Sequence, residues 1–217
     1  TIADKRSHNK IVSYLEETGI NVISEESKSI EYNERRNWEE YLLVDPLDGT
    51  KEFIKKNGEF TVNIALIKNN KPHLGIVYCP TQKTLYYNDH EKNVYKKVGE
   101  DITTLNKRNS VNESTEGLRV VVSRSHMSEE TSEYVSKLIK PKLISCGSSL
   151  KFLYIADDKA DIYPRFGPTM EWDRAAGEAV LAGAGGAVYD AQGQLHRYGK
   201  SGWRNGPFIA CAGFTVF

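Results

Sequence analysis

The sequence lacks the features that mark membrane-spanning, disulfide-bonded and nucleic-acid-binding proteins. Its 217 residues contain three cysteines, Cys79, Cys146 and Cys211, which are too widely spaced for a zinc site, so we expect reduced, packed thiols. No apolar stretch approaches the length of a spanning helix, and no signal-peptide pattern is visible. Basic and acidic side chains number 29 each, which argues against broad electrostatic binding to nucleic acid or to an anionic membrane.

These absences favour a cytoplasmic globular protein with no nucleic-acid partner and no obligatory membrane contact, although peripheral contact with the inner membrane stays open. Any recognition of phosphate must then come from local positive charge, from backbone amides or from a bound cation. The hydrophobic content of 39% is enough for one sizeable core or for two small lobes that share an interface. The chain starts at Thr1 rather than at a methionine, so we expect a fragment or a processed form.

The order of the expected elements divides the chain into two halves. The first half has a helix at 5–18 and strands at 20–24, 41–44, 60–67, 73–79, 84–88 and 93–97. The second half alternates strands at 118–123, 142–145, 160–164, 186–190 and 208–212 with helices at 128–139, 148–157 and 173–183. Polar segments at 27–37 and 100–117 are expected to be loops. This pattern predicts layered α/β architecture, with an antiparallel-sheet lobe at 1–110 and an α/β lobe at 111–217 in one compact unit.

The segment "DPLDGTKEF" at residues 45–53 follows the apolar strand and carries two carboxylates. Asp, Pro and Gly are ordinary turn residues, so a surface turn is the simplest interpretation. Positions three apart on a strand point to opposite faces, so Asp45 and Asp48 converge only if the chain turns at Pro46-Leu47. Two converged carboxylates repel each other unless a cation lies between them, and Mg²⁺ prefers such oxygen ligands. The segment is therefore a candidate metal site.

The residues that follow the aspartates add a possible anion site. If a helix starts near Gly49 and Thr50, its free amides point at the same pocket, which favours phosphate. Carboxylates, metal and helix start together indicate a phosphate-hydrolysing centre with two metal ions. Phosphatases of the haloacid dehalogenase type have one residue between their two aspartates, whereas here two residues intervene, so that alternative fails on geometry.

Further carboxylates lie at the ends of other expected elements. Glu25 and Glu26 follow a strand that could lie beside 41–44, although solvated surface charges would look the same. Asp173, in "EWDRAAGEAVLAGAGG", precedes a helix of small residues and stands where a helix N-cap belongs. Taken alone, capping is the favoured interpretation of Asp173.

These motifs together resemble those of the inositol monophosphatase superfamily, the lithium-sensitive, Mg²⁺-dependent phosphatases. The resemblance rests on "TIAD" at 1–4, Glu25, "DPLDGT" and "WDRAAG", and it covers nearly the whole chain. Within the superfamily the chain is most similar to the bacterial 3′(2′),5′-bisphosphate nucleotidases, through "DPLDGTKEFIKKNGEFTVNIALI", "SRSH", "GSSLKF" and "YPRFGPT". Inositol monophosphatases typically have Thr-Asn-Phe where this chain has residues 51–53. The implied fold is the layered sugar-phosphatase fold of inositol monophosphatase and fructose bisphosphatase.

The resemblance implies a role for each matching position. Two or three Mg²⁺ ions would be held by the side chains of Glu25, Asp45, Asp48 and Asp173 and by the backbone carbonyl of Leu47, with Asp45 bridging two ions. Thr50, hydrogen-bonded to Asp4, would orient and deprotonate the attacking water, with Glu25 also in the catalytic set. The scissile phosphate would lie on the amides of Gly49 and Thr50, and Asp173 would also lie at the substrate. The nucleotide and its uncleaved phosphate would be contacted by His126, Ser148, Lys151 and Arg165.

The resemblance thus implies a metal-binding lobe at 1–110, a nucleotide-binding lobe at 111–217, and N-terminal helices that this sequence lacks. It predicts hydrolysis of adenosine 3′,5′-bisphosphate to AMP and phosphate, with a small phosphorylated nucleotide as ligand and a monomeric or homodimeric state. Alternatives are an inositol phosphate or sugar phosphatase of the same superfamily, or a non-catalytic relative that binds nucleotide or metal. Without the resemblance, Lys151 would be an exposed helix lysine and His126 a loop histidine.

Overall fold

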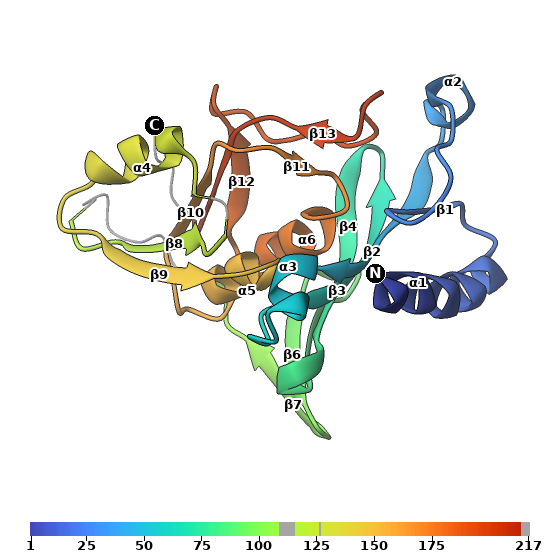
Figure 1. The fold of residues 1–217 in the computed structure, drawn as a ribbon, viewed down its shortest axis with the longest axis horizontal. Helices are drawn as coiled ribbons and strands as arrows, with labels where there is room; N and C mark the ends of the chain where they lie inside the picture. The colour runs from blue at the N-terminus through green and yellow to red at the C-terminus, as the bar shows by residue number, and fades with distance from the viewer. Residues whose placement is uncertain (109–115, 126, 214–217) are drawn as a thin grey trace.

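The helices and strands of the protein form five layers. The computed structural model describes residues 1–108, 116–125 and 127–213. A seven-stranded sheet carries one helix on its outer face, two helices separate it from a five-stranded sheet, and a fourth helix covers the second sheet (Figure 1). In layer order these helices are α1 (Ile2–Leu15), α5 (Leu150–Ala156) with α6 (Ala175–Gly183), and α4 (Glu129–Ser136). The alternating layers confirm the predicted α/β fold class.

The seven strands of the first sheet are neighbours in chain order. Strands β1 and β2 are parallel, and every later pair is antiparallel. The strands are β1 (Val22–Ser24), β2 (Glu40–Asp48), β3 (Thr61–Lys68), β4 (Lys71–Cys79), β5 (Thr84–Asn88), β6 (Val94–Val98) and β7 (Asp101–Leu105).

Two segments that were predicted to be loops contain short elements. Strand β7 lies in the 100–117 segment, where β-branched residues pair with β6 although none of the strand is buried. Helix α2 (Tyr32–Arg35) lies in the 27–37 segment, and its Arg35 is buried beneath the backbone carbonyls of Lys200 and Ser201. Both predictions were wrong because tertiary pairing, rather than local apolar content, stabilises these elements.

The second sheet has the strand order β12-β14-β10-β8-β9. Strands β8, β9 and β10 are parallel, whereas β14 is antiparallel to both of its neighbours. Its strands are β8 (Arg119–Ser123), β9 (Lys142–Cys146), β10 (Ile162–Arg165), β12 (Ala187–Asp190) and β14 (Phe208–Cys211), and a separate ribbon joins β11 (Thr169–Met170) to β13 (Arg204–Asn205). Short helices α3 (Thr50–Ile54), η1 (Glu16–Thr18) and η2 (Pro80–Gln82) complete the described elements.

Helix α6 packs very closely on the inner face of the first sheet. Residues of β3 alternate between buried and half-buried, so Ala65 and Ile67 face this helix layer. A side chain at Gly75 in β4 would lie 2.3 Å from the carbonyl oxygen of Ala176, so only glycine allows this approach. The small residues of α6 match it from the other side. This packing places the beginning of α6, and Asp173 before it, beside the end of β2.

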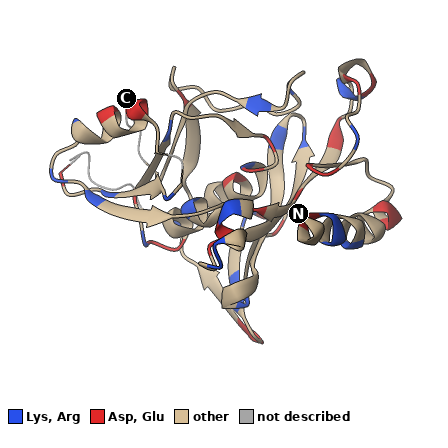
Figure 2. Ribbon diagram, viewed as in Figure 1, with Lys and Arg blue, Asp and Glu red and all other residues tan. Residues whose placement is uncertain are grey.

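Charged residues of both signs are distributed along the described part of the chain (Figure 2). Figure 2 shows basic and acidic residues of both signs spread over the sheets and helices rather than gathered on one element. Among the described residues, no helix has both the length and the apolar character needed to cross a bilayer.

Candidate active site

A β-bulge in β2 brings Asp45 and Asp48 together. Asp45 pairs with Asn63 and Asp48 with Thr61, so β2 has one more residue than β3 between the two pairs. The extra residue resets the side-chain alternation, and both carboxylates then lie on the same face. The predicted convergence is therefore present, but a bulge within the strand produces it rather than the turn expected at Pro46-Leu47. The strand continues to Asp48, with Pro46 and Leu47 inside the bulge.

Four carboxylates interact electrostatically at this bulge, and burial is the largest cause that raises the pKa of each. Burial, followed by the charges of Asp48, Glu25 and Asp173, holds the pKa of Asp45 well above its ordinary range. Burial and the neighbouring Asp48 raise the pKa of Asp173 to about 7. Loss of water around its carboxyl group, with the charge of Asp48, raises the pKa of Glu25, although that residue is exposed as a whole. The structure thus places the four carboxylates that the resemblance implied within electrostatic reach of one another.

The carboxylates are individually hydrogen-bonded. Asp45 accepts a hydrogen bond from the Leu47 amide at 3.0 Å, and Asp173 accepts one from the Met170 amide at 2.7 Å. Within the described residues, no three His, Cys, Asp or Glu side chains stand together as a ready metal-binding group. Helix α6 begins at Ala175 with Arg174 as its N-cap residue, so the capping interpretation of Asp173 was wrong.

The chemistry of the donor set fits Mg²⁺. All four side chains offer oxygen, the ligand that Mg²⁺ prefers, and their raised pKa values show that this environment disfavours uncompensated negative charge. The Oδ1 atom of Asn63 is buried beside Asp45 and has no hydrogen-bond partner. It is an acceptor that water on a bound cation would satisfy.

Thr50 joins the start of α3 to the first helix. Its hydroxyl donates to Asp4 Oδ1 at 3.2 Å and lies 3.4 Å from the Leu47 carbonyl oxygen. Asp4 is buried, with 4% of its surface exposed. Gly49 caps α3 with a φ of 93°, a left-handed conformation that suits glycine and allows the chain to leave the bulge directly into the helix. The helix start predicted near Gly49 and Thr50 is therefore present.

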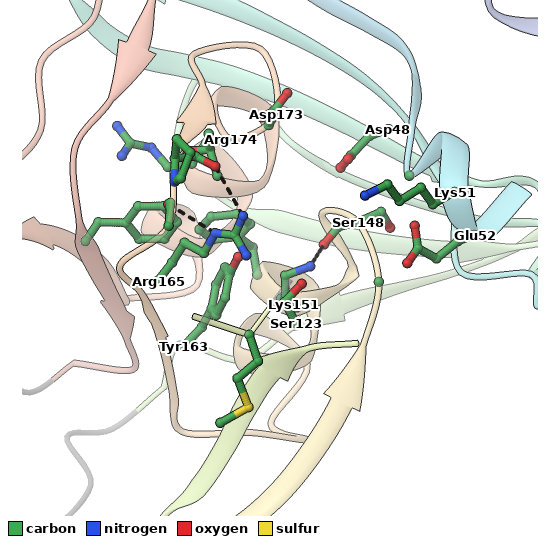
Figure 3. A pocket seen from close by; sticks show the side chains of 18 of the residues that line it. Asp48, Lys51, Glu52, Ser123, Ser148, Lys151, Tyr163, Arg165, Asp173 and Arg174 are labelled. Atoms are coloured by element: carbon green, nitrogen blue, oxygen red, sulfur yellow. Dashed lines mark hydrogen bonds between the residues drawn. The ribbon is translucent and has the colours of Figure 1, made fainter. Parts of the chain in front are cut away.

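A cavity of about 620 Å³ opens beside these carboxylates. Asp48, Lys51 and Glu52 lie on one side, with Ser148, Lys151 and Arg165 around the rest (Figure 3). Its floor contains three packed aromatic rings, those of Phe152, Tyr163 and Phe208.

The predicted substrate residues occupy this cavity with one exception. Lys151 is buried rather than exposed, and its Nζ atom donates to the Ser148 carbonyl oxygen at 2.5 Å. Burial lowers the pKa of Lys151, and the negative charge of Asp48 opposes that shift. Ser148 has a φ of 46°, an uncommon strained conformation for a non-glycine residue. His126 lies outside the described residues.

Sequence reasoning missed the polar residues that support Asp48. Asn63 and Ser149 are each 1% exposed and contact its carboxylate. Asn63 was detectable, since a polar residue stands at a buried position of an otherwise apolar alternating strand. Ser149 follows Ser148 and carried no such signal.

Comparison with known proteins identifies the family. The sequence model of the inositol monophosphatase family matches residues 1–212. The chain belongs to the inositol monophosphatase family. It is 46% identical over 200 residues to the 3′(2′),5′-bisphosphate nucleotidase CysQ of Salmonella typhimurium, covering 91% of this chain and 78% of that protein. It is also 46% identical over 196 residues to CysQ of Escherichia coli strain K12, covering 89% of this chain and 77% of that protein.

Solved structures of family members confirm the fold. The crystal structure of CysQ from Bacteroides thetaiotaomicron superposes with a TM-score of 0.90 at 42% identity, over 99% of this chain and 85% of that one. An inositol monophosphatase of Thermotoga maritima superposes with a TM-score of 0.76 at 22% identity, over 97% of this chain and 77% of that one. The sugar-phosphatase fold that the resemblance implied is therefore correct.

Proposed function

We propose that this protein is a Mg²⁺-dependent phosphatase that hydrolyses adenosine 3′,5′-bisphosphate to AMP and phosphate. The observation that carries the proposal is that a cluster of carboxylates and a positively charged cavity adjoin each other. Four mutually interacting carboxylates adjoin a cavity whose walls supply the positive charges of Lys51, Lys151 and Arg165. The relatives with 46% identity are 3′(2′),5′-bisphosphate nucleotidases, which supports the nucleotide as substrate.

The bulge residues are the proposed metal ligands. Glu25, Asp45, Asp48 and Asp173 would hold two or three ions through their carboxylates, with the carbonyl of Leu47 as a further ligand. Bound Mg²⁺ supplies charge stabilisation for phosphoryl oxygens and lowers the pKa of coordinated water. The protein's own contribution is to collect these oxygens in a buried place where only a cation relieves their mutual repulsion.

Thr50 and Asp4 are the proposed proton-handling pair. The Thr50 hydroxyl donates a hydrogen bond to Asp4, so the lone pairs of the Thr50 oxygen remain to accept a hydrogen bond from the attacking water. The water's proton would pass toward this pair as the bond to phosphorus forms. The 3′ oxygen of the nucleotide would leave with the electrons of the broken bond and take up a proton from solvent, which gives the 3′ hydroxyl of AMP. The amides of Gly49 and Thr50 would hold the scissile phosphate, and no phosphoenzyme is required.

The remaining substrate residues are proposed to bind the nucleoside and its uncleaved phosphate. Lys151 and Arg165 supply charge in a protein whose net charge is zero, and Ser148 lines the cavity beside them. His126 is proposed as a further contact on the resemblance alone. The net charge of zero and the size of the cavity fit a small-molecule ligand. A cytoplasmic location and a monomeric or homodimeric state complete the proposal.

The main rival is a phosphatase for inositol phosphates or sugar phosphates. The family match supports it equally, since inositol monophosphatases share the fold. A non-catalytic relative is the remaining alternative. The charged residues around the cavity and the names of the relatives at 46% identity favour the nucleotide.

A substrate panel tests the proposal. Phosphate release is measured with adenosine 3′,5′-bisphosphate, its sulfated precursor, inositol 1-phosphate and fructose 1,6-bisphosphate, each with Mg²⁺ and with EDTA. We expect Mg²⁺-dependent release, with the highest kcat/KM for the bisphosphate nucleotide. Asp48→Asn protein is expected to lose turnover, because a neutral amide replaces a metal ligand. Equal rates on inositol 1-phosphate, or near-normal activity of Asp48→Asn, contradict the proposal.

A further inference from the structure

The carboxylate of Asp48 is held by one of its two oxygens. Oδ2 accepts hydrogen bonds from the Ser149 amide at 2.7 Å, the Ser149 hydroxyl at 2.8 Å and Asn63 Nδ2 at 3.2 Å. Thr61 Oγ1 lies 3.4 Å from the same oxygen. Oδ1 is therefore the oxygen that is turned away from these donors.

The amide of Asn63 has only one orientation that suits these contacts. Its Nδ2 atom, which carries two protons, donates one to Asp48 Oδ2 and the other to Ser149 Oγ at 2.9 Å. Turning the amide over would place its oxygen against the Asp48 carboxylate, which repels it. Because Asn63 donates to Ser149 Oγ, the single hydroxyl proton of Ser149 is left for two acceptors, which share it as a three-centre hydrogen bond.

Those neighbours belong to two different parts of the proposed metal site. Ser149 Oγ lies 2.8 Å from Asp48 Oδ2, at the end of β2, and 2.8 Å from the carbonyl oxygen of Asp173, before α6. Ser149 thus spans the gap between two proposed ligands that are far apart in sequence. Its surface is 1% exposed, so water does not substitute for its hydroxyl.

We propose that Ser149 and Asn63 are positioning residues for Mg²⁺ binding. Both hold the Asp48 carboxylate in place, and Ser149 also sets the separation between Asp48 and Asp173. The inference rests on the proposed Mg²⁺ site. A ligating carboxylate that is held by hydrogen bonds loses no rotational freedom when the ion binds, and removal of such support typically weakens metal binding by about 10–100-fold. Neither residue needs to touch substrate.

The test measures Mg²⁺ binding without substrate. Thermal unfolding of wild-type, Ser149→Ala and Ser145→Ala protein is followed over a series of MgCl₂ concentrations. Ser145 is exposed on β9, so Ser145→Ala is a matched control for the loss of a hydroxyl. We expect the MgCl₂ concentration for the half-maximal shift to rise roughly tenfold or more in Ser149→Ala and to stay unchanged in Ser145→Ala.

Turnover assays add a second measurement, the Mg²⁺ concentration needed for phosphate release, which would not change if Ser149 only stabilised the fold. Ser149→Ala is expected to raise the Mg²⁺ requirement of phosphate release while KM for the nucleotide stays near its wild-type value at saturating Mg²⁺. If Ser149→Ala does not unfold cooperatively, Asn63→Leu takes its place, because leucine has a similar size and donates no hydrogen bond. The same rise in Mg²⁺ requirement is then expected.

The outcomes separate this inference from the proposed function. A Ser149→Ala or Asn63→Leu protein that folds and responds to MgCl₂ as the wild type does overturns the positioning role alone. A wild-type protein without any Mg²⁺-dependent shift overturns both the proposed site and the positioning role. Wild-type protein that binds Mg²⁺ but prefers inositol 1-phosphate contradicts the proposed substrate and leaves the positioning role standing.

Discussion

Arg165 combines a positive charge with a fixed geometry at the cavity. Its Nε atom donates to the Gly167 carbonyl oxygen at 3.2 Å, and its Nη2 atom donates to the Pro168 carbonyl oxygen at 3.1 Å. The planar fork of a guanidinium group can make both bonds at once, whereas a lysine ammonium is a point charge on a flexible stem. Arg165 therefore shapes the following loop as well as charging the cavity.

Replacement of Arg165 separates these two contributions. Arg165→Ala removes charge and loop bonds, and a charge-assisted hydrogen bond is worth about 1.5–3 kcal/mol, so we expect KM for adenosine 3′,5′-bisphosphate to rise roughly tenfold or more. Arg165→Lys keeps the charge and is expected to give an intermediate KM. Lys137→Ala, at the exposed residue that follows α4, controls for loss of surface charge. Steady-state kinetics on the nucleotide and on inositol 1-phosphate measure the effect. An unchanged preference in Arg165→Ala would refute the role of Arg165.

At the scale of elements, buried charges anchor the start of α6. Arg174 is 1% exposed, lies 3.0 Å from Glu178 Oε2 and donates to the Tyr198 hydroxyl at 3.1 Å. Burial raises the pKa of Glu178, and the charge of Arg174 opposes that shift. Such pairs are costly to desolvate but strongly destabilising to break. They tie the start of α6, next to Asp173, to the segment around Tyr198.

The segment before β13 places His196 in this positive environment. Burial, then the charges of Arg174 and Lys200, lower the pKa of His196 to about 4, although Asp190 and a hydrogen bond to the Pro207 carbonyl oppose the shift. The Nε2 atom is buried without a partner. The folded protein therefore holds this imidazole neutral where an unfolded chain would protonate it.

This pKa predicts the sign of one pH dependence. Above the ordinary value of 6.5, His196 is neutral in both states and contributes no pH dependence. As pH falls from about 6.5 toward about 4, the unfolded chain takes up a proton that the folded state excludes, so stability decreases. Urea unfolding at several pH values in this window should show a smaller loss for His196→Gln than for the wild type. His90→Gln, at a side chain 80% exposed, is the control. Identical losses in all three proteins would exclude His196 as the cause.

At the scale of the whole molecule, Glu52 in α3 and Glu59 before β3 contact the segments that follow two strands of the second sheet, β8 and β9. Arg124, after β8, contacts Glu59 with both Nε and Nη2 at 2.6 Å. Glu59 also accepts a hydrogen bond from the Gly147 amide at 2.9 Å, and Glu52 accepts one from Ser125 at 2.6 Å. The segments after β8 and after β9 that these contacts hold also line the cavity, through residues such as Ser128 and Ser148. The division into lobes at residue 110 stays a prediction.

Loosening this connection should affect substrate binding more than chemistry. Glu59→Gln removes the charge from a bidentate pair and weakens the contact with Gly147, so we expect KM for the nucleotide to rise a few-fold with little change in kcat. Glu133→Gln, which removes an exposed i,i+4 pair with Lys137, is the matched control. Steady-state kinetics at saturating Mg²⁺ test the expectation. A fall in kcat with constant KM in Glu59→Gln would show that the connection acts on the metal site instead.

Much of the fold was predictable, because most elements carry their own local pattern. The predicted strand at 84–88 and the predicted helix at 173–183 are apolar or strongly periodic. The observed elements, β5 and α6, lie within two residues of these bounds. Strand β7 and helix α2 are polar, and partners far away in the chain stabilise them. Local propensity cannot register such partners.

The sequence by itself determined the chemistry of this protein. The residue types and spacing of Asp45, Asp48, Gly49 and Thr50 indicated a cation site and a phosphate reaction, and the resemblance to a known family added Glu25 and Asp173. Only the tertiary structure decided how the carboxylates meet, because a bulge depends on the register between β2 and β3. It also showed that Ser149 and Asn63 support Asp48 and that Lys151 is buried. The contact of Ser149 with Asp48 joins residues 101 positions apart, and a hydrogen bond across such a distance leaves no periodic trace in the sequence.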